Sequence, residues 1–297
     1  MNRALTLLAA SACAAVAVSS ACFAAESRAL DFRLGKTGNP ATVQFHMVHG
    51  EGSKQSGNWS QSVALGELQG LGAAQFNAST STPIRFALVR PAGRFDCSGT
   101  IRSSDGRGTC AFAADDAFSA TLARRGVGRP SRDQSYKLAL SNFRVDVLDA
   151  LAAAAYPAPT IDQAIALGIF KINPAYVDGL SRSGYRLGSI DDLVGFKIHG
   201  VSPELISAYR SLGYRQLSAD DLTAMAIHGV TPGFIRGFAS LGYRDLPADK
   251  LVELKIFNVT PGDVRALQTQ GMALPSADQL VRRRLGGFGS ESRRRGD

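Results

Sequence analysis

The sequence predicts an α+β protein in which a small antiparallel β-rich domain is followed by an all-α array of helical hairpins. Three observations predict this order. Short alternating apolar runs fill residues 30–125, a repeat with a period of 29 residues follows them, and helix-start and helix-stop residues recur at fixed places in each repeat unit. The chain has 297 residues, of which 45% are hydrophobic, so it is long enough for two domains and too apolar to be disordered.

The first 24 residues are typical of a secretory signal peptide. A basic start at Met1–Arg3 precedes the apolar run 4–18, and small residues lead to an expected cleavage site after Ala24. The run is shorter than the roughly 20 residues that a membrane span needs, so we expect a soluble mature chain in the periplasm or outside the cell. Lipid attachment at Cys22 is the weaker alternative. The Ala- and Arg-rich composition indicates a bacterial source.

Two cysteines remain after the signal peptide is removed. Cys13 and Cys22 lie in the cleaved segment, which leaves Cys97 and Cys110 in an oxidising compartment where thiols tend to pair. The sequence therefore predicts one disulfide between them. Two reduced, buried cysteines are the alternative.

The two cysteines lie in alternating stretches on either side of a turn-rich segment, which predicts a β-hairpin. The register that pairs the cysteines also pairs Phe95 with Phe112 across the strands. This register places residues 103–104 at the tip instead of Asp105-Gly106, so we expect a bulge or a wider loop there.

The β-rich domain is expected to span residues 25–126. Runs 43–48 and 84–89 alternate between apolar and polar residues, which predicts antiparallel strands. Asp115 is placed to cap a short helix that ends before Gly126. Residues 127–140 are rich in Gly, Pro, Ser and Arg, and we interpret them as a linker.

The helical array is expected to span residues 141–281, where the 29-residue period is the strongest signal in the chain. A half-repeat over 141–155 starts the array, and residues 282–297 are interpreted as a disordered basic tail. The residues that follow the period are Ile169, Ile198, Ile227, Ile256, Pro174, Pro203, Pro232, Pro261, Gly184, Gly213, Gly242, Gly271, Tyr185, Tyr214 and Tyr243.

Each repeat unit is expected to contain two helices. The first begins at a capping hydroxyl that precedes an acid or amide by three residues, at Thr160, Ser189, Ser218 and Ser276. It ends at a residue that tolerates the left-handed conformation, at Gly200, Gly229 and Asn258. The second begins at the periodic proline, where the missing N–H costs nothing, and ends at the glycine before tyrosine. Because such a short helix pair cannot bury its apolar face alone, the units must stack.

The segments His199-Gly-Val-Ser-Pro203 and His228-Gly-Val-Thr-Pro232, each leading to Leu-Gly-Tyr, resemble the helical repeats of some exported bacterial proteins of unknown function and of the periplasmic regions of BlaR-type membrane metallopeptidases. The resemblance covers residues 141–280, and the hairpin that contains Cys97 resembles the β unit that precedes such repeats. It implies a periplasmic accessory or sensing module. It does not carry catalysis, because those peptidases need a His-Glu-x-x-His helix that this sequence lacks.

The sequence carries no nucleophile elbow, phosphate loop, dinucleotide fingerprint or zinc-type cysteine pairing, so we predict no enzyme and no cofactor. His46, His49 and Glu51 are the clustered metal-type ligands, but residues i and i+3 of a strand point to opposite faces, and we predict no metal site. A hydrolase or metal-dependent enzyme with its site in the β-rich domain is the alternative.

Two histidines recur with the repeat, at His199 and His228. Phe170 and Phe257 occupy the equivalent positions in other units, which favours a half-buried ring near a helix end over a catalytic base.

The predicted function is a non-enzymatic interaction or scaffold role, with a protein or an envelope polyanion as the partner. A nucleic-acid binder of the helix-hairpin-helix kind is an alternative, but residues 151–280 contain 11 Lys and Arg against 12 Asp and Glu, although the whole chain has a net charge of +8. The candidate partner contacts follow Gly-Tyr in three successive units and are Arg186, Arg215 and Arg244. The acids that could instead neutralise them are Asp191, Asp220 and Asp249.

Overall fold

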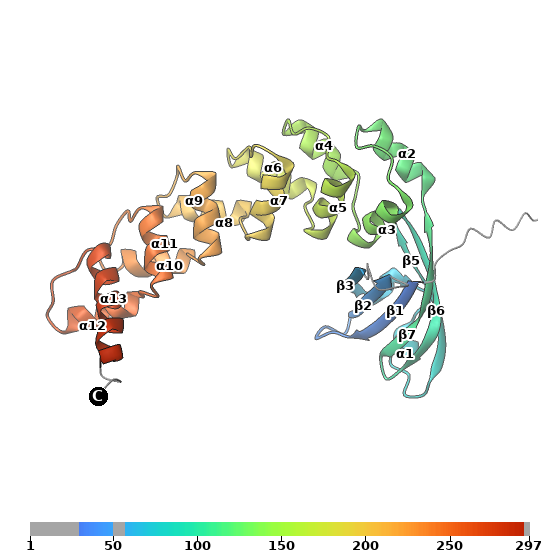
Figure 1. The fold of residues 1–297 in the computed structure, drawn as a ribbon, viewed down its shortest axis with the longest axis horizontal. Coiled ribbons are helices and arrows are strands. Elements are labelled where there is room, and N and C mark those ends of the chain that lie inside the picture. The colour runs from blue at the N-terminus through green and yellow to red at the C-terminus, as the bar shows by residue number, and fades with distance from the viewer. Residues whose placement is uncertain (1–29, 50–56, 294–297) are drawn as a thin grey trace, which may run out of the picture.

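The computed structural model describes residues 30–49 and 57–293. They form an antiparallel sheet followed by a curved row of short helices that leads away from it (Figure 1). This confirms the α+β class and the order of the two parts. The predicted signal peptide and Glu51 lie outside the described residues. The side chain of His49 is not described either.

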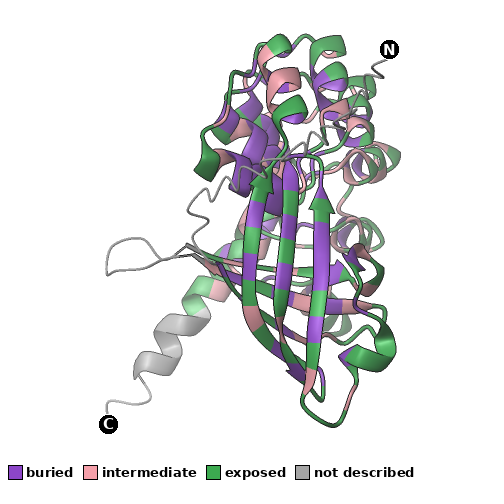
Figure 2. Ribbon diagram, turned by 90° about the vertical axis from the view of Figure 1, so that its right-hand side faces the viewer, coloured by how far each residue is buried: buried purple, intermediate pink, exposed green. Residues whose placement is uncertain are grey.

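The described part of the sheet has seven strands in the order β3-β2-β1-β7-β6-β5-β4. Buried and exposed residues alternate along its strands, so one face packs on a core (Figure 2). A short 3₁₀ helix (Leu65–Glu67) connects β3 to β4, the two ends of this order, and α1 (Ala73–Phe76) connects β4 to β5. The strands are β1 (Leu30–Lys36), β2 (Thr42–His49), β3 (Gly57–Ala64), β4 (Leu68–Gln69), β5 (Thr82–Arg90), β6 (Gly93–Arg102) and β7 (Asp105–Ala114).

The hairpin of β6 and β7 has the predicted register. Cys97 pairs with Cys110 and forms the expected disulfide, and Phe95 pairs with Phe112. Both cysteines are buried in the core. The alternation of the two strands and the cysteine pair therefore predicted the register of this hairpin.

The expected bulge or wider loop at the hairpin tip is wrong. Ser103 and Ser104 form a tight two-residue turn, both with positive φ (50° and 68°), a conformation that usually selects Asn-Gly. The loop after α1 holds them there. The Ser103 amide donates to the Ala78 carbonyl at 2.6 Å, and the Ser104 hydroxyl donates to Oδ1 of Asn77 at 3.0 Å. Tertiary hydrogen bonds thus replace the local turn preference.

The sheet and the array share one core through a helix that the sequence assigns to the linker 127–140. This helix, α3 (Arg132–Ser141), follows α2 (Asp116–Arg124), which Asp115 caps as expected. The ring of Tyr136 on α3 lies 5.7 Å from that of Phe95 and 5.8 Å from that of Phe112, both edge-on. The helix therefore joins the two parts of the molecule.

The predicted half-repeat is a complete unit, because α3 pairs with α4 one period upstream of the recognised repeats. First helices pack on first helices, as α3 on α5 and α9 on α11, and second helices on second helices, as α4 on α6 and α8 on α10. Part of the segment interpreted as a tail is helical, since α13 runs to Arg293. The helices are α4 (Asp146–Ala153), α5 (Ile161–Ile169), α6 (Pro174–Arg182), α7 (Ile190–Ile198), α8 (Pro203–Ser211), α9 (Ala219–Ile227), α10 (Pro232–Ala239), α11 (Ala248–Ile256), α12 (Pro261–Thr269) and α13 (Ala277–Arg293).

The helix ends follow from the repeated residues. Thr160 accepts a hydrogen bond from the Gln163 amide, and the Gln163 side chain accepts one from the Thr160 amide, which closes a capping box. At the other end of the first helix, Gly200 has a φ of 77° and the next amide, that of Val201, donates back to the Phe196 carbonyl at 2.9 Å. Val201 is fully buried, so each helix stop also anchors the following turn in the core.

The disulfide gives a first prediction. Replacing Cys97 and Cys110 by Ser should lower the free energy of unfolding by about 3 kcal/mol, because the bridge closes a 13-residue separation and restricts the unfolded chain. Denaturant unfolding of the two proteins measures the difference, and reductant should reproduce it in the parent only.

The exported parent, analysed by intact mass, should begin at Ala25 and resist alkylation. Alkylation of both thiols without reductant would contradict the prediction.

The helix stops give a second prediction. Gly229 has a φ of 66°, so Gly229→Val should cost about 1–2 kcal/mol of stability through the steric penalty of that conformation. Gly195→Ala is the matched control, because Gly195 lies inside α7 with open space around an added methyl group and should be neutral or stabilising. Thermal unfolding followed by circular dichroism compares them. Equal melting of Gly229→Val and the parent would refute the role of Gly229 as a left-handed stop.

Candidate functional site

The three candidate arginines lie at one edge of the array, in the loops that lead from one unit to the next. All three are exposed. The guanidinium of Arg186 donates to the carbonyl of Ala155 in the preceding unit at 2.8 Å. Within the described part of the chain, the side chains of Arg215 and Arg244 have neither a hydrogen-bond nor an ion-pair partner, so the suggested neutralisation by the following aspartates is not formed there.

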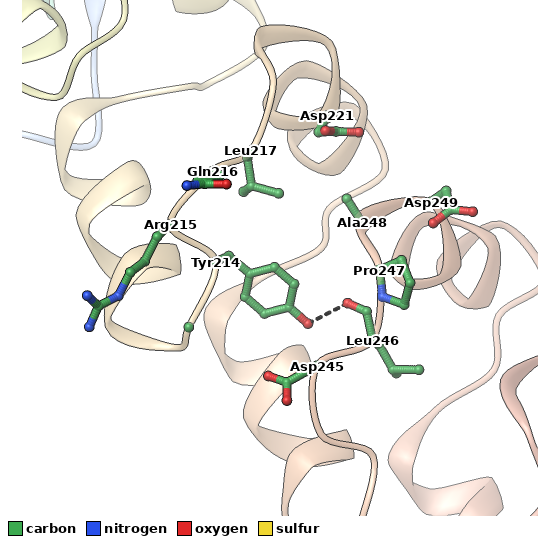
Figure 3. A pocket seen from close by; sticks show the side chains of 11 residues that line it. Tyr214, Arg215, Gln216, Leu217, Asp221, Asp245, Leu246, Pro247, Ala248 and Asp249 are labelled. Atoms are coloured by element: carbon green, nitrogen blue, oxygen red, sulfur yellow. Dashed lines mark hydrogen bonds between the residues drawn. The ribbon is translucent and has the colours of Figure 1, made fainter.

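A hydrogen bond from the tyrosine next to each arginine joins successive units. The hydroxyl of Tyr185 donates to the carbonyl of Leu217 at 2.7 Å. That of Tyr214 donates to the carbonyl of Leu246 at 2.7 Å (Figure 3). Tyr243 makes the same bond one unit later, to Pro275. Each bond ties a loop to the loop 32 residues further along, so these bonds set the spacing of the loop edge.

Tyrosines of the second helices make corresponding bonds on the other edge. Tyr176 of α6 and Tyr209 of α8 donate to the carbonyls of Val201 and Val230, which belong to the turn of the following unit. Both rings are buried, and burial raises the pKa of Tyr209 to about 12. These phenols are therefore neutral donors at physiological pH.

The hollow beside Arg215 is acidic. It has a volume of about 470 Å³, lies between the loops of two successive units, and is lined by Asp221, Asp245 and Asp249 (Figure 3). Arg215 points away from these carboxylates in the same view. A polyanion that reached the arginine row would therefore meet three acids beside it, whereas a cationic group would be attracted into the hollow.

A series of side-chain hydrogen bonds also joins the starts of successive first helices, and its central steps carry negative charge without a counter-charge. Gln163 donates to Asp191 of the next unit at 3.2 Å, and at the far end Lys250 donates to Asp278 at 2.6 Å. At the two central steps, aspartate stands where Gln163 or Lys250 would stand. By the 29-residue period, the residues at these steps are Asp192 with Asp220, and Asp221 with Asp249.

The periodic isoleucines are the feature whose exposure the sequence did not indicate. Each is the last residue of a first helix, and 52–54% of its surface is exposed. A helical projection could have found them, because each lies on the same stripe as the aspartate seven residues earlier. The residues and their exposed fractions are Ile169 (52%), Ile198 (52%), Ile227 (53%) and Ile256 (54%).

The histidines are not brought together. His46 lies exposed on β2, and the described residues contain no group of three His, Cys, Asp or Glu that could hold a metal ion. His199 and His228 cap α7 and α9 with exposed side chains, so the expected half-burial is wrong for them. A helix C-cap at the outer edge of a turn leaves the side chain free to extend into solvent.

A cavity of about 320 Å³ lies between the sheet and the first two helix pairs. Its buried charge, Arg90, is paired with Glu67 at the sheet edge, and Arg144 is paired with Asp146 at 3.0 Å. The hydroxyl of Ser141, which also lines the cavity, donates to the carbonyl of Leu138. The ion pairs are incomplete, because Nε of Arg90 and Oδ1 of Asp146 are buried without a hydrogen-bond partner. The outer surface of the array, in contrast, carries its unpaired charge and apolar side chains in the open.

The tyrosine bonds give a third prediction. Tyr214→Phe removes the donor to the Leu246 carbonyl and should lower the free energy of unfolding by about 1 kcal/mol. Arg215→Gln, which alters the next residue but no bond of the described residues, should leave stability unchanged. Urea unfolding of both variants and the parent provides the comparison. A Tyr214→Phe curve that superimposes on that of Arg215→Gln would show that the bond does not hold the units together.

No protein-family model matches the chain, and no curated protein is significantly similar to it.

Proposed function

We propose that the chain is an exported, non-enzymatic interaction module that binds a protein or an envelope component through its helical repeats. One observation carries the proposal. The same exposed side chains recur at the same place in successive stacked units, which produces rows of chemically identical groups along an extended surface. Repeat arrays use such surfaces to bind extended partners. A sensing-accessory role, as the resemblance of the repeats implies, is one form of this function.

The placement outside the cytoplasm is supported by the disulfide. Cys97 and Cys110 are joined in the structure, and such bridges persist in oxidising compartments. Within residues 30–49 and 57–293, no helix has the length and apolar character to cross a membrane. We infer that the module works in the periplasm or outside the cell, after removal of the predicted signal peptide.

Position-dependent crosslinking tests this function. A photoreactive amino acid would be placed in the full exported chain on the array, at Arg215 or Ile227, and at the matched exposed sheet position Val89. We expect crosslinks to a partner in envelope preparations from the array positions and none from the sheet position. Crosslinks from Val89 alone, or from none of the three positions, would contradict the proposal.

The arginine row is tested in the same preparations. If the row contributes, the triple variant Arg186→Gln/Arg215→Gln/Arg244→Gln should recover less of an anionic partner than the parent at low salt, because surface charge pairs are strongest there. Equal recovery of every partner would remove these arginines from the binding surface while leaving the array itself as the interaction module.

A further inference from the structure

The exposed isoleucines form a row whose composition folding does not require. A polar residue at the last position of each first helix would cost little folding free energy, because that position is about half exposed. It is nevertheless aliphatic in four successive units. Leu285 of α13 continues the series and is 49% exposed. Scattered exposed apolar residues need no explanation, but an aligned series of them marks an interaction surface. We call Ile169, Ile198, Ile227 and Ile256 the isoleucine row.

The position equivalent to the isoleucine row is buried in α3, which is the first helix of the array and packs against the sheet. In α3, which packs against β6 and β7, the equivalent residue is Leu140, and only 3% of its surface is exposed. The isoleucine row therefore continues, along the array, a position that is buried at the junction with the sheet. This continuity indicates that the row is suited to packing against another polypeptide.

A row of acids runs parallel to the isoleucine row. Each isoleucine follows an exposed aspartate by seven residues, which is nearly two helical turns, so the two side chains share one stripe of the helix about 10 Å apart along its axis. Small residues separate them in the central units. The acidic row consists of Asp162, Asp191, Asp220 and Asp249, and the small residues are Ala166, Gly195 and Ala224.

The acids of the central units lack counter-charges. At the two ends of the array, Asp133 is paired with Lys137 and Asp278 with Lys250. In the described structure, no ion pair involves Asp191 or Asp220 or the adjacent helix-start acids of α5, α7 and α9. The nearby Lys197 lies over the Tyr176 ring of α6, at 4.5 Å from its centroid, and so belongs to the side that faces the second helices.

We propose that the outer face of α5, α7 and α9 docks a basic amphipathic polypeptide segment of a partner protein. Its aliphatic side chains would pack on the isoleucine row and its Lys or Arg side chains would pair with the acidic row. Because stacked helices lie about 8–10 Å apart, the partner's apolar anchors would recur at about that spacing, which is one turn of three residues in a polyproline II segment, where every third side chain points the same way. The acidic row disfavours an anionic lipid surface and a polyanion at this face. The inference rests on the proposed function and names its partner class.

Binding of designed peptides to the full exported chain tests the inference. The probe is a fluorescein-labelled peptide in which Leu recurs at every third residue among Lys, and the matched peptides carry Glu for Lys or Ser for Leu. We expect the parent to bind the Leu/Lys peptide and neither matched peptide, by fluorescence anisotropy at low salt. Ile198→Ser/Ile227→Ser and Asp191→Asn/Asp220→Asn should each weaken binding by about tenfold or more. Val89→Ser, at an apolar residue of the sheet that is 45% exposed, should leave affinity unchanged.

The variants should keep the melting temperature of the parent, because the substituted isoleucines are exposed and asparagine retains the oxygen that accepts the Gln163 hydrogen bonds. Equal affinity of the parent and the isoleucine variant would overturn the docking site, and binding of the Glu peptide would overturn the basic character of the partner. A dimer of the parent in sedimentation that the isoleucine variant loses would assign the face to a second copy of the chain, which also overturns the inference. If the isoleucine variant still crosslinks an envelope partner from Arg215 as the parent does, the docking face fails and the proposed function stands.

Discussion

The hydrogen bond from a tyrosine hydroxyl of one unit to a loop carbonyl of the next is the interaction on which the array depends. A pair of nine-residue helices buries too little apolar surface to be stable alone, so each unit needs its neighbours. Hydrophobic contact supplies the attraction but is not directional. The bonds from Tyr185 to Leu217 and from Tyr214 to Leu246 add a fixed direction and distance at the loop edge. Tyr176 of α6 and Tyr209 of α8 do the same at the turn edge, so both edges of these two units are held in register.

The regular spacing of the units arranges the exposed side chains in rows that a partner could contact together. An isoleucine at one helix end contributes little to binding, but the same residue held at the same exposure in four units presents a regular surface. The charge pattern adds direction across that surface, because acids lie at one end of each first helix and isoleucines at the other. In the docking that we propose, this pattern would distinguish the two sides of an amphipathic partner without a deep pocket.

Features that depend on local chemistry were predictable from the sequence. Capping residues, left-handed stops and N-terminal prolines act within a few residues, so the helix pairs could be placed, and the cysteine register follows from strict alternation. The first helix of the first unit was assigned to the linker although Ser131 and Gln134 form a capping box, because Ser141-Asn142 replaces the expected histidine and glycine and Val145 replaces the proline. The serine turn could not be predicted, since it is held by hydrogen bonds to the distant residues Asn77 and Ala78. The exposed isoleucines could have been found by a helical projection, because they share a stripe with the aspartates.

The last helix of the array determines how far the stacking can continue. In five successive first helices, the eighth residue of the unit is a large apolar side chain in the core, as with Leu167 and Leu254. In α13 the residue at this place is Arg283, and it is exposed. At the opposite end the sheet covers α3. One end thus presents a guanidinium, and the other is occupied by the sheet. Open-ended solenoids can grow into filaments by repeating their stacking, and both ends of this array depart from the internal units where such stacking would continue.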